Sequence, residues 1–209
     1  MSLLSFIETR LFTKLVLECL SDDEYGGLLS NRLRYPSEVF AAMREVWPQQ
    51  LPISVRISAH DWVDGGITAD DAVEIARRFK AAGADMIDCS SGQVSARQKP
   101  SYGRMYQTPF ADRIRNEAGI PTIAVGAISE ADHVNSIVAA GRADLCAVGR
   151  PHLANPAWTL LEAARIGFVA QPWPKQYTAA KQQLERNLER ERAQAGMASV
   201  EQVNRDLGL

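Results

Sequence analysis

The chain has 209 residues, a formal net charge of −2 and a sequence pI near 6.0. This length is sufficient for one domain with a substantial apolar core, and the scattered cations form no basic patch, so we expect no nucleic-acid partner. The three cysteines are widely spaced, and the three histidines are distant from one another in the sequence, so we expect neither a disulfide framework nor a metal site.

The chain begins with a segment that we expect to form an amphipathic helix over residues 3–19. Leu4, Ile7, Leu11 and Leu15 recur at helical spacing on one face. Four charged residues among the first 20 exclude a membrane span, and the segment lacks the uncharged apolar run of a signal peptide. We therefore expect a cytoplasmic protein with no membrane partner.

A second helix is expected after a glycine-containing turn at residues 22–27. Ser30 or Asn31 is positioned to cap this helix, and Pro36 falls near its first turn, where a missing N–H is tolerated. The Trp-Pro pair at 47–48 ends it. Apolar side chains between these limits recur at the helical period.

Four short apolar runs then alternate with stretches that are typical of helices. Each run ends in a cation, a glycine or small polar residues. The runs lie at 53–58, 85–89, 121–126 and 144–149, and helices are expected at 69–82, 108–118 and 130–140. This alternation predicts an α/β fold with a parallel sheet, whose carboxyl edge presents ligand-binding groups. Four strands cannot close the usual eight-stranded barrel, which needs about 250 residues.

Local signals add detail to this pattern. Thr68 and Asp71 have the spacing of a capping box at the start of the helix 69–82. Residues 93–107 form a polar loop whose length is typical of functional loops. The stretch 172–209 is rich in Gln, Glu and Arg and poor in large apolar side chains, so we expect a charged helical tail that is solvated or docks on a partner.

Seven short sequence words occur in a fixed order between residues 22 and 158. They are Asp23-Glu-Tyr-Gly-Gly27, Asn31-Arg-Leu-Arg34, Val55-Arg-Ile-Ser58, Asp88-Cys-Ser-Ser-Gly92, Ala124-Val-Gly-Ala-Ile128, Gly141-Arg-Ala-Asp144 and Gly149-Arg-Pro151. In this order they resemble the Old Yellow Enzyme family of FMN-dependent NAD(P)H:flavin oxidoreductases. Three further words, Ser58-Ala-His-Asp-Trp62, Tyr102-Gly-Arg-Met-Tyr-Gln-Thr-Pro-Phe110 and Gly149-Arg-Pro-His-Leu153, are similar to the reductase-like domain of anthraniloyl-CoA monooxygenase and salicylyl-CoA hydroxylase.

The resemblance implies an FMN-binding TIM (β/α)8 barrel, of which this chain carries about the last four β/α units. The expected parts are an atypical N-terminal helix at 1–21, the C-terminal half of the barrel at 22–171 and a charged helical tail at 172–209. The resemblance also implies that NAD(P)H, as a transient reductant, supports the reduction of an activated alkene or an acyl-CoA intermediate. A homo-oligomer, or a place in a larger polypeptide, is expected.

The catalytic residues are unknown at this stage. The family's proton-donating pair, two histidines or a histidine and an asparagine, precedes the turn at 22–27. Residues 1–21 contain no histidine, so we expect a truncated chain. Two alternatives stay open: a non-catalytic FMN-binding or interaction half-barrel, which would expose strand edges and apolar faces, and another phosphate-binding barrel.

Four residues are candidates for the FMN site. By the resemblance, Arg56 places a cation at the pyrimidine edge of the flavin, where it stabilises the reduced form; the alternative is an inward arginine that pairs with a carboxylate. Gly126, Gly149 and Arg150 follow the third and fourth strands. Glycine lets backbone N–H groups approach a phosphate, and arginine adds a charged contact, whereas the alternative for each glycine is a tight turn.

Ser91, Arg104 and His60 are weaker candidates. Ser91 follows the second strand and either lines the substrate side or ends the strand in a plain turn. Arg104, in the loop at 93–107, either meets an acyl-CoA phosphate or is a surface cation. His60 lies at a strand end and is the histidine best placed to assist catalysis, although a lone histidine is more commonly structural.

Overall fold

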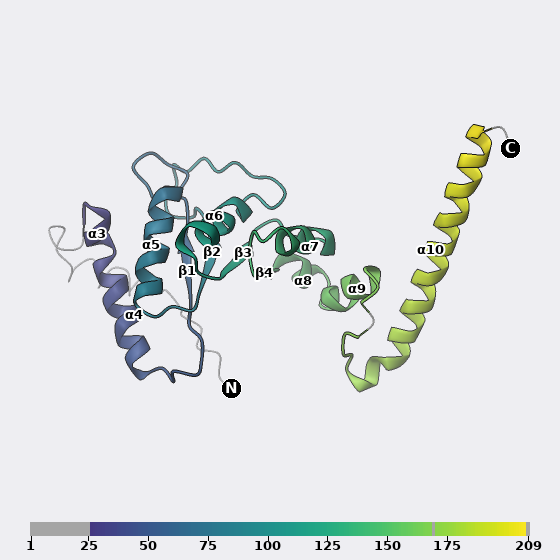
Figure 1. Cartoon of the computed structure of the whole chain (residues 1–209), viewed down its shortest axis with the longest axis horizontal. Coiled ribbons are helices and arrows are strands. Elements are labelled where there is room, and N and C mark those ends of the chain that lie inside the picture. The colour runs from purple at the N-terminus through teal and green to yellow at the C-terminus, as the bar shows by residue number, and fades with distance from the viewer. Residues whose placement is uncertain (1–25, 169, 208–209) are drawn as a thin grey trace. The chain divides into compact units, whose positions relative to one another are not determined.

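The computed structural model describes residues 26–168 and 170–207 (Figure 1). The helix expected at 3–19 lies outside these ranges. The chain divides into two compact units. The first contains the chain through Ala127 together with Ile137–Ala147, and the second contains Ile128–Ser136 together with the chain from Val148 onward.

The first unit is built on a four-stranded sheet in which the spatial order β1-β2-β3-β4 follows the sequence. The strands are β1 (Ser54–Ser58), β2 (Met86–Ser90), β3 (Thr122–Val125) and β4 (Leu145–Ala147). All three strand pairings are parallel. The four predicted strands and their parallel arrangement are therefore confirmed, with ends that differ by one to two residues.

Among the described residues, four helices belong wholly to this unit. They are α3 (Leu29–Arg32), α4 (Arg34–Val46), α5 (Ala69–Ala81) and α6 (Thr108–Ala118). The capping box at α5 is confirmed: Thr68 Oγ1 accepts from the Asp71 N–H at 3.2 Å, and the Asp71 carboxylate accepts from the Thr68 N–H at 2.9 Å. The hydrogen bonds that the Thr68 N–H and, to a smaller extent, the Thr68 hydroxyl donate to the Asp71 carboxylate lower the pKa of Asp71.

The predicted cap of the second helix is wrong. The chain forms the short helix α3 first, so α4 begins at Arg34 with Leu33 as its N-cap, and no side chain caps it. Ser30 and Asn31 lie inside α3 instead. A capping residue can be recognised in the sequence only when the start of the helix is placed correctly. Here the extra turn of α3 moves the start of α4 to Arg34, beyond both predicted caps.

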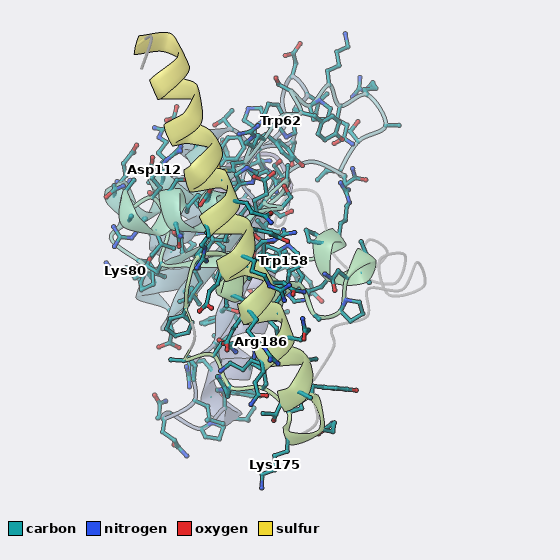
Figure 2. All side chains as sticks on the ribbon, turned by 90° about the vertical axis from the view of Figure 1, so that its right-hand side faces the viewer. Trp62, Lys80, Asp112, Trp158, Lys175 and Arg186 are labelled. Carbon is teal, nitrogen blue, oxygen red and sulfur yellow. The ribbon has the colours of Figure 1, made fainter. Side chains whose placement is uncertain are left out.

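One face of the sheet packs against the helices. Ile87 and Cys89 on β2 and Thr122 and Ala124 on β3 point to this face and are fully buried. Figure 1 shows α4 and α5 lying side by side, and they are joined by an edge-to-face contact between Phe40 and Phe79 with ring centroids 5.5 Å apart. Lys80, labelled in Figure 2, donates to the carbonyls of Ala118 and Gly119 and ties α5 to the end of α6.

The opposite face is much less covered. Arg56, Asp88, Ile123 and Leu145 are register partners across the four strands, so their side chains share this face. All four are half-buried or exposed, and 51% of Leu145 is accessible. A parallel sheet that is covered on one face and open on the other is the arrangement expected of part of a barrel.

The second unit is helical. It holds the first part of α7 (Ala131–Ala139), then α8 (Arg150–Ala154), α9 (Trp158–Arg165), η1 (Lys175–Tyr177) and the long α10 (Thr178–Leu207). The buried Glu162 carboxylate accepts from the Ala131 N–H at 3.0 Å and pairs with Arg165 at 2.7 Å. Arg192 on α10 donates to carbonyls at the end of α9. No helix among the described residues is long and apolar enough to span a membrane.

Candidate functional site

A chain of side-chain hydrogen bonds joins the carboxyl ends of β1, β2 and β3. Trp62, in the loop after β1 and labelled in Figure 2, donates from Nε1 to Ser91 Oγ at 2.9 Å. The Ser91 hydroxyl donates to Gln107 Oε1 at 2.6 Å, and Gln107 Nε2 donates to the Val125 carbonyl at 2.8 Å. The loops that follow β1 and β2 are thereby fixed to each other and to the end of β3.

This network decides the environment of Ser91. Its hydroxyl accepts from Trp62 and donates to Gln107, and the residue is buried. Its donor is therefore already used within the protein, and the structure gives Ser91 a positioning part at the edge of the sheet. Its predicted contact with substrate stays a prediction.

An aromatic cluster lies beside the network. His60 stacks on Phe110 with ring centroids 5.6 Å apart and approaches Trp62 at 4.6 Å. Its Nδ1 accepts from the Trp62 N–H at 2.9 Å, which indicates that this nitrogen carries no proton. The ring centroid of Tyr106 lies 6.5 Å from that of Trp62 and 5.3 Å from that of Tyr102. His60 is thus fixed by packing at the carboxyl edge, where the sequence placed it.

Arg56 lies on the open face of the sheet and pairs with its register partner. Its Nε donates to Asp88 Oδ2 at 2.9 Å, so the carboxylate partner considered as an alternative is present. The pair leaves 59% of the Arg56 side chain accessible, against 16% for Asp88. Asp88 Oδ1 is buried and has no hydrogen-bond partner among the described residues. The geometry thus combines the ion pair with an exposed guanidinium.

Gly126 occupies a position that only glycine fits. Its φ is +103°, a region that side chains rarely adopt, and an added Cβ would lie 2.3 Å from Gln107 Nε2 and 3.2 Å from Tyr106 Cε1. Gln107 is the residue that sequence reasoning missed. Its only signal was its place immediately before the helix start at Thr108, within the word that begins at Tyr102.

Gly149 and Arg150 belong to the second unit. Gly149 is the N-cap of α8 with a φ of −105°, and an added Cβ there would meet nothing within 4 Å. Arg150 is exposed. Tight packing within the protein therefore does not explain the glycine, and the space beside it is open to a ligand.

The remaining candidates carry less chemistry. Arg104 is exposed in the loop between β2 and α6. Burial, with a smaller contribution from the Asp88 carboxylate, raises the pKa of Cys89 to about 12, so this thiol is not a nucleophile near neutral pH. Within the described ranges no group of three His, Cys, Asp or Glu residues could hold a metal ion.

Comparison with known proteins gives consistent matches. A sequence profile of the NADH:flavin oxidoreductase / NADH oxidase family matches residues 15–165. NADPH dehydrogenase from Geobacillus thermodenitrificans (strain NG80-2) is 44% identical over 155 residues, which are 74% of this chain and 44% of that protein. NADPH dehydrogenase from Clostridium acetobutylicum is 42% identical over 160 residues, which are 76% and 46% of the two chains.

A solved structure gives the same result at the level of fold. The complex of 2-naphthoyl-CoA reductase with 2-naphthoyl-CoA aligns with a TM-score of 0.57 and 25% identity, over 64% of this chain and 21% of that one. The TIM-barrel class predicted from the sequence is thereby confirmed, with four β/α units in the described residues. The chain spans less than half the length of either dehydrogenase.

Proposed function

Because this chain belongs to the NADH:flavin oxidoreductase / NADH oxidase family, we propose that it binds FMN and serves in NAD(P)H-dependent reduction of an activated alkene or an acyl-CoA intermediate. The observation that carries the proposal is the exposed guanidinium of Arg56 on the open face of the sheet. Arg56 lies two residues before the carboxyl end of β1. Parallel α/β proteins bind their ligands at this end of the strands.

The described residues fit an anionic, phosphate-bearing flavin. Arg56 and Arg150 are exposed cations, and the open space beside Gly149 admits a group that approaches the backbone. Arg56 would hold the pyrimidine edge of the flavin and stabilise negative charge there. Gly149 and Arg150 would hold the phosphate through backbone N–H groups and one charge-assisted contact. The family resemblance also assigns Gly126 to phosphate binding.

FMN, when bound, supplies hydride exchange between NAD(P)H and the substrate. The residues of this chain would bind the flavin and orient the substrate beside it. The hydrogen bonds from Trp62 through Ser91 to Gln107 fix the loops at the carboxyl edge. His60, held by Trp62 and Phe110, is the histidine we propose to face the substrate. We also propose that the protein acts in the cytoplasm, as a homo-oligomer or within a larger polypeptide.

The open sheet face supports a second candidate function, an interaction half-barrel without catalysis. Leu145 and Ile123 are accessible or half-buried on that face, and apolar surface of this kind favours association with another protein. FMN binding distinguishes the two functions, because an interaction module has no need for a flavin.

The test is a titration of the 209-residue chain with FMN, followed by the change in flavin absorbance. Gly149→Ala should weaken binding about tenfold or more while the free energy of unfolding changes by less than about 0.5 kcal/mol, because the new Cβ meets only open space. Arg150→Ala should weaken binding roughly 10- to 150-fold, the value of one charge-assisted contact. Gly103→Ala, also in open space, is the matched control and should leave the affinity unchanged. If the unaltered chain binds no FMN, the interaction half-barrel is favoured; if both variants bind as tightly as the parent, the phosphate assignment is wrong.

A further inference from the structure

The loop between β2 and α6 carries only positive charge. From Cys89 to Ala111 the sequence holds Arg97, Lys99 and Arg104 and no aspartate or glutamate. All three cations are exposed. Their side chains make no ion pair or hydrogen bond within the described ranges, whereas Arg113 and Arg115, just beyond the loop, are both paired with carboxylates.

The backbone of this loop is fixed although its cations are unpaired. Near its start, the Gln93 N–H donates to Gln98 Oε1 at 2.6 Å. In its middle, the Lys99 N–H donates to the Trp62 carbonyl at 2.8 Å. At its end, the Met105 N–H donates to the Ala127 carbonyl at 3.2 Å. The loop therefore runs along the carboxyl edge from β1 to β3, as the trace at the upper end of the sheet in Figure 1 shows. A fixed backbone with free cationic ends is organised in advance for an anion.

An accessible aromatic ring lies between two of the cations in the sequence. Tyr102 falls between Lys99 and Arg104, and 67% of its surface is exposed. Its ring is held by an edge-to-face contact with Tyr106, with centroids 5.3 Å apart and an interplanar angle of 73°. Exposed tyrosine rings beside cations bind nucleotide bases by stacking, while the cations neutralise the phosphates.

We propose that the loop at 91–107 binds the adenosine phosphate and diphosphate moiety that NADPH and CoA thioesters share. Arg97, Lys99 and Arg104 receive the phosphates, and Tyr102 stacks on the adenine. The chemistry is common to both ligands, since each carries an adenosine with a phosphate on the ribose and a diphosphate on the 5′ side. The inference rests on the proposed function, because it places the tail of the reductant or substrate beside the flavin-binding edge.

Calorimetric titration of the full chain, with and without saturating FMN, provides the test. Adenosine 2′,5′-bisphosphate represents the adenosine end of NADPH, and adenosine 3′,5′-bisphosphate represents that of CoA. The nucleotide that binds more tightly therefore identifies whether the loop serves NADPH or a CoA thioester. Removing one cation, in Arg97→Gln, Lys99→Gln or Arg104→Gln, should weaken binding of the preferred nucleotide about five- to tenfold, and removing all three should abolish it. Tyr102→Ala should weaken the binding of the nucleotide but leave the binding of inorganic phosphate unchanged.

Two controls separate this inference from the proposed function. Lys175→Gln removes an exposed cation elsewhere in the chain and should leave nucleotide binding unchanged. Loop variants should bind FMN as the parent does, and Arg150→Ala should bind the adenosine bisphosphates as the parent does. Nucleotide affinity that survives in the triple variant overturns the inference even where FMN binds, and inorganic phosphate that binds as tightly as either nucleotide also overturns it. Failure to bind FMN overturns the proposed function alone, because nucleotide binding is measured without FMN as well.

Discussion

Arg56 and Asp88 are register partners on β1 and β2, and Arg56 Nε donates to Asp88 Oδ2 over 2.9 Å. The pair joins neighbouring strands on the open sheet face, where most of the arginine remains accessible. An ion pair this exposed contributes about 1 kcal/mol or less to folding. Stability alone therefore gives arginine little advantage over a neutral residue at this position.

Arg56→Gln tests the two interpretations of this residue. If Arg56 holds the flavin, the variant should bind FMN about tenfold more weakly or worse, while its free energy of unfolding falls by no more than about 1 kcal/mol. Arg142→Gln is the matched control, because Arg142 pairs with Asp112 at 3.0 Å in the same unit. FMN titration and urea unfolding of both variants give the answer. Equal FMN affinity in the parent and both variants would leave Arg56 with a structural part only.

Gly126→Ala should lower the free energy of unfolding by about 2–4 kcal/mol, since the new side chain adopts an unfavourable φ and also meets Gln107. Gln107→Ala removes the close contact but not the backbone strain. The double variant should therefore recover part of the loss relative to the sum of the single variants. Chemical unfolding of the parent, the two single variants and the double variant measures this coupling. Strict additivity would show that contact with Gln107 is not the reason for glycine at position 126.

The pKa of Cys89, raised to about 12 by burial, predicts how stability changes in alkali. The thiol keeps its proton in the folded chain up to that pH, whereas in the unfolded chain it loses the proton near the ordinary value of 9.0. Between these values the unfolded state binds fewer protons, so rising pH favours unfolding by about 1.4 kcal/mol per pH unit from this group. Below pH 9 both states keep the proton, so there this group adds no pH dependence and none of the stability has yet been lost.

Urea unfolding at a series of pH values above 9 tests this behaviour. Cys89→Ala should reduce the slope of stability against pH relative to the parent. Ile87→Val alters a fully buried neighbour on the same strand without removing a titrating group, so it should lower stability by about 1 kcal/mol and keep the parent slope. A slope that is the same in the parent and Cys89→Ala would contradict the raised pKa.

Turnover by the 209-residue chain should be slow. Negative charge develops on the carbonyl oxygen of an activated alkene during reduction, and one preorganised donor at such an oxygen contributes roughly 100-fold or more in rate. The family resemblance places the donor pair before the turn at 22–27, and residues 1–21 hold no histidine. With added FMN and NADPH, the chain should therefore reduce an enone at least about 100-fold more slowly than the Geobacillus NADPH dehydrogenase, in steady-state assays of both proteins. Equal rates would show that these donors are dispensable.

Local signals predicted much of the fold. The helix at Ala69–Ala81 followed from Thr68 and Asp71, and the strands followed from short apolar runs that end in a cation, a glycine or small polar residues. The cap expected at Ser30 or Asn31 was wrong because an extra helical turn precedes α4. Local sequence contains no information on that turn, since its ends carry no capping side chain.

The site was less predictable because its contacts are long-range. Trp62 reaches Ser91 across 29 positions, and Ser91 reaches Gln107 across 16. Such pairs depend on the register of β1 against β2, and a shift of one residue would turn every side chain to the other face. The sequence did indicate that Arg56 could pair with a carboxylate, but only the register shows that its partner is Asp88.

The hydrogen bond from Trp62 to Ser91 also makes this indole a natural optical reporter. Its ring packs against His60, Phe110 and Tyr106, and its backbone carbonyl accepts from the Lys99 N–H in the loop between β2 and α6. Indole emission shifts with local polarity, and bound flavin absorbs light at the wavelengths where indole emits. A chain in which Trp47, Trp158 and Trp173 are replaced by phenylalanine would therefore report events at the carboxyl edge of the sheet through the fluorescence of a single residue, without any attached dye.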